Sequence, residues 1–143
     1  MRVVLQRVSR ARVMVDGRVV GGIEGPGLVV LLGITNDDGP EQVAWMARKV
    51  PELRLLDGEV SVSEVGAPVL VISQFTLYGD ARLGRRPTWQ AAAAAPVAEP
   101  VYDAFCAELE RLGTPTARGV FGADMRLELV NDGPMTLVLD SAG

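Results

Sequence analysis

The chain has 143 residues, of which 48% are hydrophobic and 22% charged, and its formal net charge is −4. This length allows one domain with a sizeable core, and the composition is typical of a soluble globular protein. The sequence contains no histidine and a single cysteine, which excludes Ser-His-Asp and Cys-His catalysis, His-ligated metal sites, thiolate clusters and an internal disulfide. Catalysis would have to use hydroxyls, carboxylates, backbone groups or the substrate itself. The apolar runs are far shorter than the ~20 residues that span a membrane, and the arginine-containing N-terminus does not resemble a signal peptide, so we expect a cytoplasmic protein.

The first half of the chain predicts strands followed by a helix. Apolar and polar residues alternate over 2–8 and again over 11–16, where Asp16-Gly17 predicts a hairpin into 18–23. The continuous apolar run at 27–35 is typical of a strand buried on both faces. A helix is expected from Pro40 with Asp38 as its cap, because apolar residues then recur at helical spacing: Val43, Met46, Ala47 and Val50.

The second half repeats the alternation of strand and helix. A second buried strand is predicted over 68–80, followed by a loop and an alanine run that reads as frayed helix or coil. Pro100 is expected to open a second helix that Gly113 ends. The last stretches, TARGVF, MRLELV and MTLVLD, predict three further strands. This order favours an α/β fold: one domain over 1–143, a layered sandwich with a mixed β-sheet and two main helices.

Three stretches do not have the pattern of plain scaffold. SQFTLYGD at 73–80 places polar groups where a buried strand ends, which is where α/β sheets commonly bind ligands. GVFGADM at 119–125 is rich in glycine but lacks phosphate-loop spacing. NDGPMT at 131–136 reads as a hairpin turn, except that its proline cannot donate to a strand ladder. Taken singly, each is also explained as an ordinary strand end, loop or turn.

The charges are unevenly distributed along the chain. Arg82, Arg85 and Arg86 form a basic cluster in the loop GRRPTW, although the whole chain is acidic. The net charge argues against non-specific nucleic-acid binding, but it leaves room for a local basic patch.

Taken together, SQFTLYGD, GRRPTW, GVFGADM and VNDGPMTL, with MRVVLQRVSRARVMVDG at the start, closely resemble the bacterial D-aminoacyl-tRNA deacylase family, once named after D-tyrosyl-tRNA. The resemblance runs from Met1 to about Ser141. It implies a homodimeric, metal-independent esterase without a cofactor. The implied substrates are the ester between a D-amino acid and the terminal adenosine of tRNA, and glycine wrongly attached to alanine tRNA; no membrane is implied.

The resemblance also implies the site residues. Gly133-Pro134 would be a cis peptide that enters the partner subunit's pocket, although from the residues alone a trans Gly-Pro turn is the default. Ser73, Gln74, Phe75 and Thr76 would line that pocket. Met125 would lie beside the Gly-Pro tip, and Arg7 would help to hold it. In this arrangement backbone carbonyls occupy the space of an L side chain, so that chirality is read by the backbone.

The catalytic step is open between two mechanisms. Thr76 is a candidate nucleophile, but the chain supplies no histidine to activate its hydroxyl. We favour attack by water, with the backbone N–H groups near Phe75 and Thr76 stabilising the oxyanion and the 2′-hydroxyl of the tRNA assisting. Two other functions stay open: an esterase or amidase acting on small D-aminoacyl compounds, and a non-catalytic tRNA- or nucleotide-binding module.

Overall fold

The computed structural model describes residues 1–141. Its strands are β1 Arg2–Val15, β2 Arg18–Ile23, β3 Gly27–Gly33, β4 Val69–Ser73, β5 Thr116–Arg118 and β6 Arg126–Asp140. Its α-helices are α1 Pro40–Glu52, α2 Val62–Val65 and α3 Ala95–Arg111, and η1 Phe75–Tyr78 is a 3₁₀ turn. The predicted α/β domain with two main helices is therefore confirmed, with the short helix α2 added.

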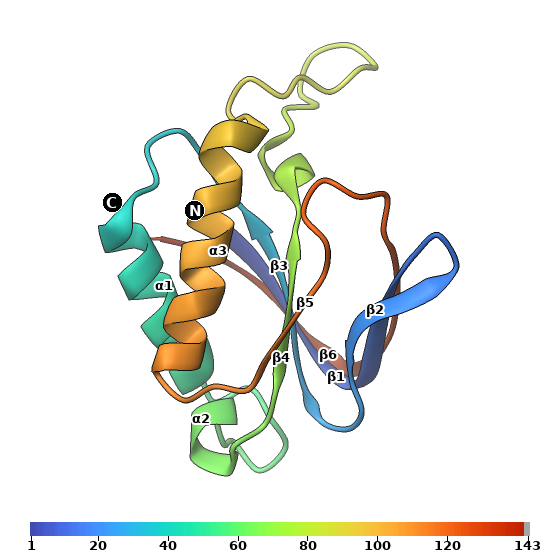
Figure 1. The fold of residues 1–143 in the computed structure, drawn as a ribbon, viewed down its shortest axis with the longest axis vertical. Coiled ribbons are helices and arrows are strands. Elements are labelled where there is room, and N and C mark those ends of the chain that lie inside the picture. The colour runs from blue at the N-terminus through green and yellow to red at the C-terminus, as the bar shows by residue number, and fades with distance from the viewer. Residues whose placement is uncertain (142–143) are drawn as a thin grey trace.

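The strands form one mixed sheet that curls toward a barrel (Figure 1). β1 pairs along one edge with β3 and then β2, and along its other edge with β6, all antiparallel. β3, β4 and β5 are parallel neighbours. β2 closes on β5 so tightly that a Cβ at Gly21 would collide with the carbonyl oxygen of Arg118. The mixed sheet expected from the sequence is thus present, and it is nearly closed into a barrel, which the predicted layered sandwich did not include.

The central strands β3 and β4 are buried on both faces, because they are continuous apolar runs whose successive side chains point to opposite sides of the sheet. Val69 and Val71 of β4 point into the core beneath α1 and α3, which lie side by side against one face (Figure 1). Leu70 and Ile72 point into a second cluster inside the curl of the sheet. The predicted buried strand is correct in kind, but it ends at Ser73, where the chain turns into η1.

Three further boundary predictions are wrong. The stretches 2–8 and 11–16 do not form two strands, because β1 runs unbroken from Arg2 to Val15 and β6 pairs with both parts of it. Helix α3 begins at Ala95, so Pro100 lies inside it rather than at its start. MRLELV and MTLVLD are likewise one strand, β6, and no hairpin separates them.

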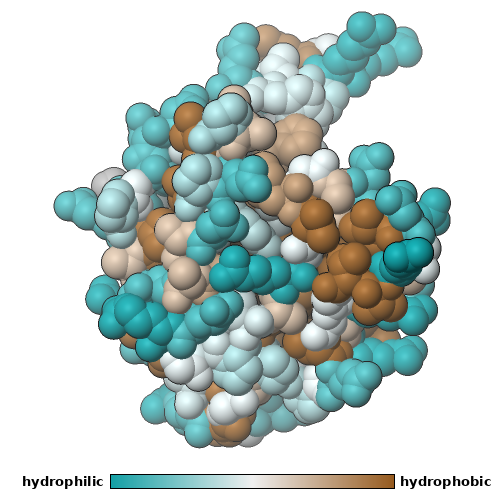
Figure 2. Space-filling model, viewed as in Figure 1, coloured by the Kyte–Doolittle hydropathy of each residue, from teal (hydrophilic) through white to brown (hydrophobic). Residues whose placement is uncertain are grey.

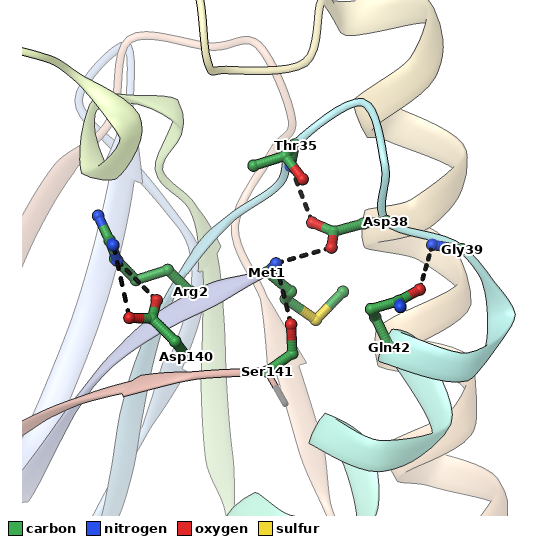
Figure 3. Close-up of polar contacts among 8 residues, drawn as sticks. All are labelled: Met1, Arg2, Thr35, Asp38, Gly39, Gln42, Asp140 and Ser141. Carbon is green, nitrogen blue, oxygen red and sulfur yellow. Dashed lines mark hydrogen bonds and ion pairs between the residues drawn. The ribbon is translucent and has the colours of Figure 1, made fainter. Parts of the chain in front are cut away.

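The prediction for Asp38 is also wrong, because this residue does not cap α1. Gly39 occupies the N-cap position, and the Asp38 carboxylate instead accepts from the α-amino group of Met1 at 2.7 Å and from the backbone N–H of Thr35 at 2.8 Å (Figure 3). The same amino group donates to the Ser141 hydroxyl at 3.2 Å. These contacts join the beginning of β1, the loop before α1 and the segment after β6.

Among residues 1–141, no helix combines the length and the hydropathy needed to cross a lipid bilayer.

Candidate active site

Two of the three unusual stretches meet at one pocket of about 740 Å³ at the end of β4. Ser73, Gln74 and Phe75 form one wall, because the chain leaves the sheet here and turns into η1. Met125 belongs to the opposite stretch, where the chain enters β6. The remaining lining is mostly apolar and comes from Leu32, Ile34, Ile72, Trp89, Ala92, Ala93, Ala94, Ala95, Ala98, Phe121, Gly122, Ala123, Asp124 and Leu127.

Close packing fixes both walls of the pocket. Gly119 lets Met125 pack against Ile72, since a Cβ at this glycine would lie 2.7 Å from the methionine sulfur and 3.0 Å from the Ile72 Cδ1. On the other wall, the rings of Phe75 and Trp89 meet edge to face with centroids 5.3 Å apart. The Phe75 side chain is nonetheless 55% exposed, which leaves an aromatic surface at the pocket mouth.

The alanine run forms part of the pocket, which sequence reasoning did not anticipate. Ala93 is held in place because its N–H donates to the carbonyl oxygen of Ile34 at 2.9 Å. Small side chains along this wall leave room for a ligand where larger ones would fill it. Asp124, the one charged residue of the lining, was also missed as an individual site residue. The sequence offered one indication of its role, because Asp124 lies within the unusual stretch GVFGADM.

Thr76 follows the lining residues on η1 and is exposed. Its hydroxyl accepts a hydrogen bond from the side-chain amide of Gln74, a group that cannot remove its proton. In the backbone, the N–H of Gln74 donates to Leu32 and that of Leu77 donates to Gln74. The N–H groups of Phe75 and Thr76 have no hydrogen-bond partner within residues 1–141, as is usual for the first residues of a helical turn.

The Gly133-Pro134 peptide bond is cis and lies on a protrusion of β6. Gln6 of β1 pairs with Thr136 and Val8 pairs with Asn131, so four residues of β6 lie opposite one residue of β1. That one residue is Arg7. The stretch read as a turn in the sequence is therefore an outward bulge in a continuous strand.

Arg7 holds this bulge through its guanidinium group. It donates to the carbonyl oxygens of Asp132 at 2.9 Å and Gly133 at 3.2 Å, and on its other side to the carbonyl oxygen of Leu55 at 3.2 Å. Ion pairs to Asp132 at 3.3 Å and Asp57 at 3.5 Å surround a side chain that is only 13% exposed. The structure thus brings Arg7 and Gly133 together, while the part that either residue plays in binding substrate stays a prediction.

Within one chain the bulge does not reach the pocket. Ser73 pairs with Leu32 near the end of β3, whereas Arg7 pairs with Leu28 near its start. Four residues along a strand correspond to about 13 Å, and β6 lies three strand spacings from β4, about 14 Å along the sheet. Met125 therefore lies with Ser73 and away from Gly133-Pro134 of its own chain. Its expected place beside the Gly-Pro tip requires a second copy and stays a prediction.

A second, larger depression of about 1020 Å³ lies between β1, β2 and β6. It contains the ion pair of Arg12 with Glu128, joined at 2.7 Å, and none of the predicted site residues. We place the site in the smaller pocket because two of the unusual stretches converge there.

Burial raises the pKa of two side chains outside the pocket lining, Tyr78 and Cys106. Burial raises the pKa of Tyr78, the last residue of η1, to about 12, and the nearby Asp38 carboxylate adds to the effect. Arg2 lies over the Tyr78 ring, with its guanidinium carbon 5.0 Å from the centroid, and donates to the Leu77 carbonyl oxygen at 3.1 Å. Burial raises the pKa of Cys106 to about 11, which makes this thiol a core group rather than a nucleophile.

Comparison with known proteins gives a consistent result. The sequence model of the family described as D-Tyr-tRNA(Tyr) deacylase matches residues 4–140. A D-aminoacyl-tRNA deacylase of Kineococcus radiotolerans is 61% identical over 141 residues, covering 99% of this chain and 100% of the relative. That of Acidothermus cellulolyticus is 62% identical over 140 residues, covering 98% and 99%.

Solved structures extend the likeness to the fold. The structure titled c-Myc DNA Unwinding Element Binding Protein superposes with a TM-score of 0.93 at 36% identity over the full length of both chains. A probable eukaryotic D-amino acid tRNA deacylase superposes with a TM-score of 0.84 at 18% identity, covering 96% of this chain and 97% of the other, and shows the shared fold alone. The resemblance drawn from the sequence motifs is confirmed: the chain belongs to the D-Tyr-tRNA(Tyr) deacylase family, whose members are hydrolases of the aminoacyl-tRNA ester.

Proposed function

We propose that this chain hydrolyses the ester of D-aminoacyl-tRNA, releasing the D-amino acid and tRNA, and also removes glycine from alanine tRNA. The observation that carries the proposal is the division of the site. Ser73, Gln74 and Phe75 line a pocket at one end of β4. Arg7 fixes the Gly133-Pro134 bulge elsewhere on the same chain. The substrate places the reaction in the cytoplasm, where aminoacyl-tRNA serves translation.

A homodimer would complete the site, because a two-fold axis makes two equivalent contacts in which each bulge enters the other subunit's pocket. The edge of β6 supports this arrangement. Within residues 1–141, β6 pairs only with β1, so its other edge is free along a strand of 15 residues. Exposed valines lie on it at Val130 and Val138, an apolar edge that a second copy would cover.

Chiral selection is assigned to the bulge. The carbonyl oxygen of Gly133 is held by Arg7, and the missing side chain of glycine permits close approach of a substrate. A carbonyl aimed at the substrate's Cα accepts from its ammonium group and occupies the space that an L side chain needs. A D side chain points away into the pocket, and glycine, which has no side chain, passes the same filter.

We assign the chemical step to water rather than to an enzyme nucleophile. The unpartnered N–H groups of Phe75 and Thr76 would donate to the oxyanion that develops on the ester carbonyl. Ser73 and Gln74 shape the wall that presents these groups, and the tRNA 2′-hydroxyl next to the ester would assist proton transfer. We infer that no metal is needed, since the sequence has no histidine and one cysteine.

The test is hydrolysis of matched D- and L-tyrosyl-tRNA, and of glycine on alanine tRNA, by chelator-treated protein. We expect release of D-tyrosine and glycine and sparing of the L form. Equal cleavage of both enantiomers would contradict the chiral filter, and activity lost with EDTA and restored by zinc would contradict the metal-independent step. Sedimentation at assay concentration should show a dimer, and a fully active monomer would disprove the shared site.

A further inference from the structure

The loop between β4 and α3 carries positive charge beside the pocket mouth. We call residues 81–88 the arginine loop; its three arginines are Arg82, Arg85 and Arg86. It extends from the body of the molecule at the top of Figure 1, and the same projection is strongly hydrophilic in Figure 2. All three arginines are exposed.

The base of the loop is fixed in place. Asp80 and Thr88 exchange two backbone hydrogen bonds, each 2.9 Å long. Trp89 follows directly, lines the pocket and packs against Phe75. Its ring also lies against Gly79, where a Cβ would come within 2.5 Å of a ring carbon. The loop therefore leaves the body at a defined position at the rim of the pocket.

The charges of the loop are only partly neutralised. Arg82 donates to the Asp80 carboxylate at 2.9 and 2.7 Å, and these hydrogen bonds lower the pKa of Asp80 to about 2. Arg85 and Arg86 have no ion pair or hydrogen bond to any of residues 1–141. Three arginines and one aspartate make the segment 80–88 +2 on a chain of net charge −4. Such a local excess is an electrostatic site for a polyanion.

We propose that Arg85 and Arg86 bind backbone phosphates at the 3′ end of the tRNA and thereby hold the aminoacyl ester over the pocket. This inference rests on the proposed function. An ester in the pocket places the terminal adenosine at its rim, so the preceding phosphates lie within reach of a loop that starts there. The guanidinium fork matches phosphate geometry, and exposed arginines gain this contact without a large desolvation cost.

A variant pair isolates this contact. Arg85→Gln/Arg86→Gln removes both unpaired charges of the loop. Arg48→Gln/Lys49→Gln removes two adjacent exposed charges from α1, which also lack ion-pair partners among the described residues and do not line the pocket. Both variants lower the net charge by the same amount. A difference between their kinetics therefore depends on where the removed charges lie and not on the total charge.

The measurement is kcat and KM on D-tyrosyl-tRNA over a range of salt concentrations. For the loop variant we expect KM to rise roughly tenfold with kcat unchanged, and the slope of log(kcat/KM) against log salt to become shallower by roughly 1.4, since each phosphate contact to a single strand contributes about 0.7. The α1 variant should behave as the unaltered protein. Equal kinetics for the two variants would overturn the proposal.

A shorter substrate and a binding measurement distinguish failure of the phosphate contact from failure of the proposed function. D-tyrosyl-adenosine has the ester but no phosphate, so the loop variant should hydrolyse it at the unaltered rate. An equal loss on this compound would show that the loop supports the pocket rather than the phosphates. Binding of uncharged tRNA tests the loop even if the unaltered protein fails to hydrolyse D-tyrosyl-tRNA. In that case the proposed function falls, while weaker tRNA binding by the loop variant alone would still support the contact.

Discussion

The guanidinium of Arg7 donates a hydrogen bond of 3.2 Å to the carbonyl oxygen of Gly133, a residue 126 positions away in the sequence. The same group also donates to Asp132 and Leu55, so one side chain ties the bulge of β6 to the segment after α1. The orientation of the bulge therefore depends on a residue of a different strand.

Arg7→Lys should disable the site although it keeps the charge. A lysine ammonium is a point donor and cannot replace a planar fork that serves three carbonyl oxygens. We expect activity on D-aminoacyl-tRNA to fall at least about tenfold and the free energy of unfolding to fall by about 1.5–3 kcal/mol. Urea denaturation and deacylation assays measure the two effects. Arg12→Lys, on the same strand but exposed and paired with Glu128, is the control and should change little; an active Arg7→Lys enzyme would contradict the role of Arg7.

Gly133→Ala should abolish activity without unfolding the chain. The nearest atom to a Cβ at this position is the Asn131 Oδ1 at 3.7 Å, an ordinary contact, so the isolated fold accommodates the methyl group. In the proposed dimer that methyl group enters the space reserved for the substrate. The comparison is Gly39→Ala, where the nearest atom to the Cβ position is likewise an ordinary contact, the Gln42 Oε1 at 3.8 Å. If Gly133→Ala kept the full activity of Gly39→Ala and of the unaltered protein, the space beside Gly133 would not be used by the substrate, and the proposed role of Gly133 in chiral selection would be wrong.

Thr76→Ala should retain most of the activity. The Thr76 hydroxyl is engaged by the Gln74 amide and has no base beside it, so we expect a decrease of less than about tenfold. Loss of a covalent nucleophile costs on the order of 10⁶ in kcat. Single-turnover kinetics with labelled D-tyrosyl-tRNA distinguishes the two cases. An acyl-enzyme trapped on Thr76 would refute attack by water.

Asp38→Ala should destabilise the fold. The α-amino group of Met1 and the Asp38 carboxylate form an ion pair of 2.7 Å, with side chains 0% and 4% exposed. Removing one partner of a buried pair costs about 3–5 kcal/mol, because the remaining charge is left uncompensated. Asp38→Asn keeps an acceptor oxygen and should lose less. Chemical denaturation of both variants gives the comparison, and equal stability of Asp38→Ala and the unaltered protein would disprove the role of the pair.

Cys106 should resist thiol reagents in the folded protein. The residue is 0% exposed, and burial raises its pKa from the ordinary 9.0 to about 11. Because the folded pKa is raised, the stabilisation that the neutral thiol contributes is complete below pH 9 and is lost as the pH rises from 9 to 11. Labelling with a chromogenic disulfide should be absent in buffer and complete in denaturant, with activity unchanged after exposure to the reagent. Rapid labelling of active protein at neutral pH would contradict the burial.

Local sequence patterns correctly predicted much of the secondary structure. Asp16-Gly17 closes the predicted hairpin with positive φ angles of 52° and 77°, which the right-handed twist of the flanking strands favours. The periodicity of Val43, Met46 and Val50 correctly predicted the buried face of α1. The motifs around Ser73 and Gly133 were sufficient to indicate the family, because their spacing along the chain is itself specific.

The tertiary structure decided how these pieces meet. The sequence of NDGPMT is compatible with a hairpin turn, but pairing of β6 with the whole length of β1 makes it a bulge opposite Arg7. Asp38 has the local pattern of a helix cap, yet a buried amino group 37 residues away is the stronger partner for its carboxylate. The alanine run has no periodicity to indicate its place, and the hydrogen bond from the Ala93 N–H to the Ile34 carbonyl oxygen fixes it as a wall of the pocket. Each of these outcomes depends on a contact between residues that are distant in the sequence. The local sequence pattern carries no information about the energy of such a contact.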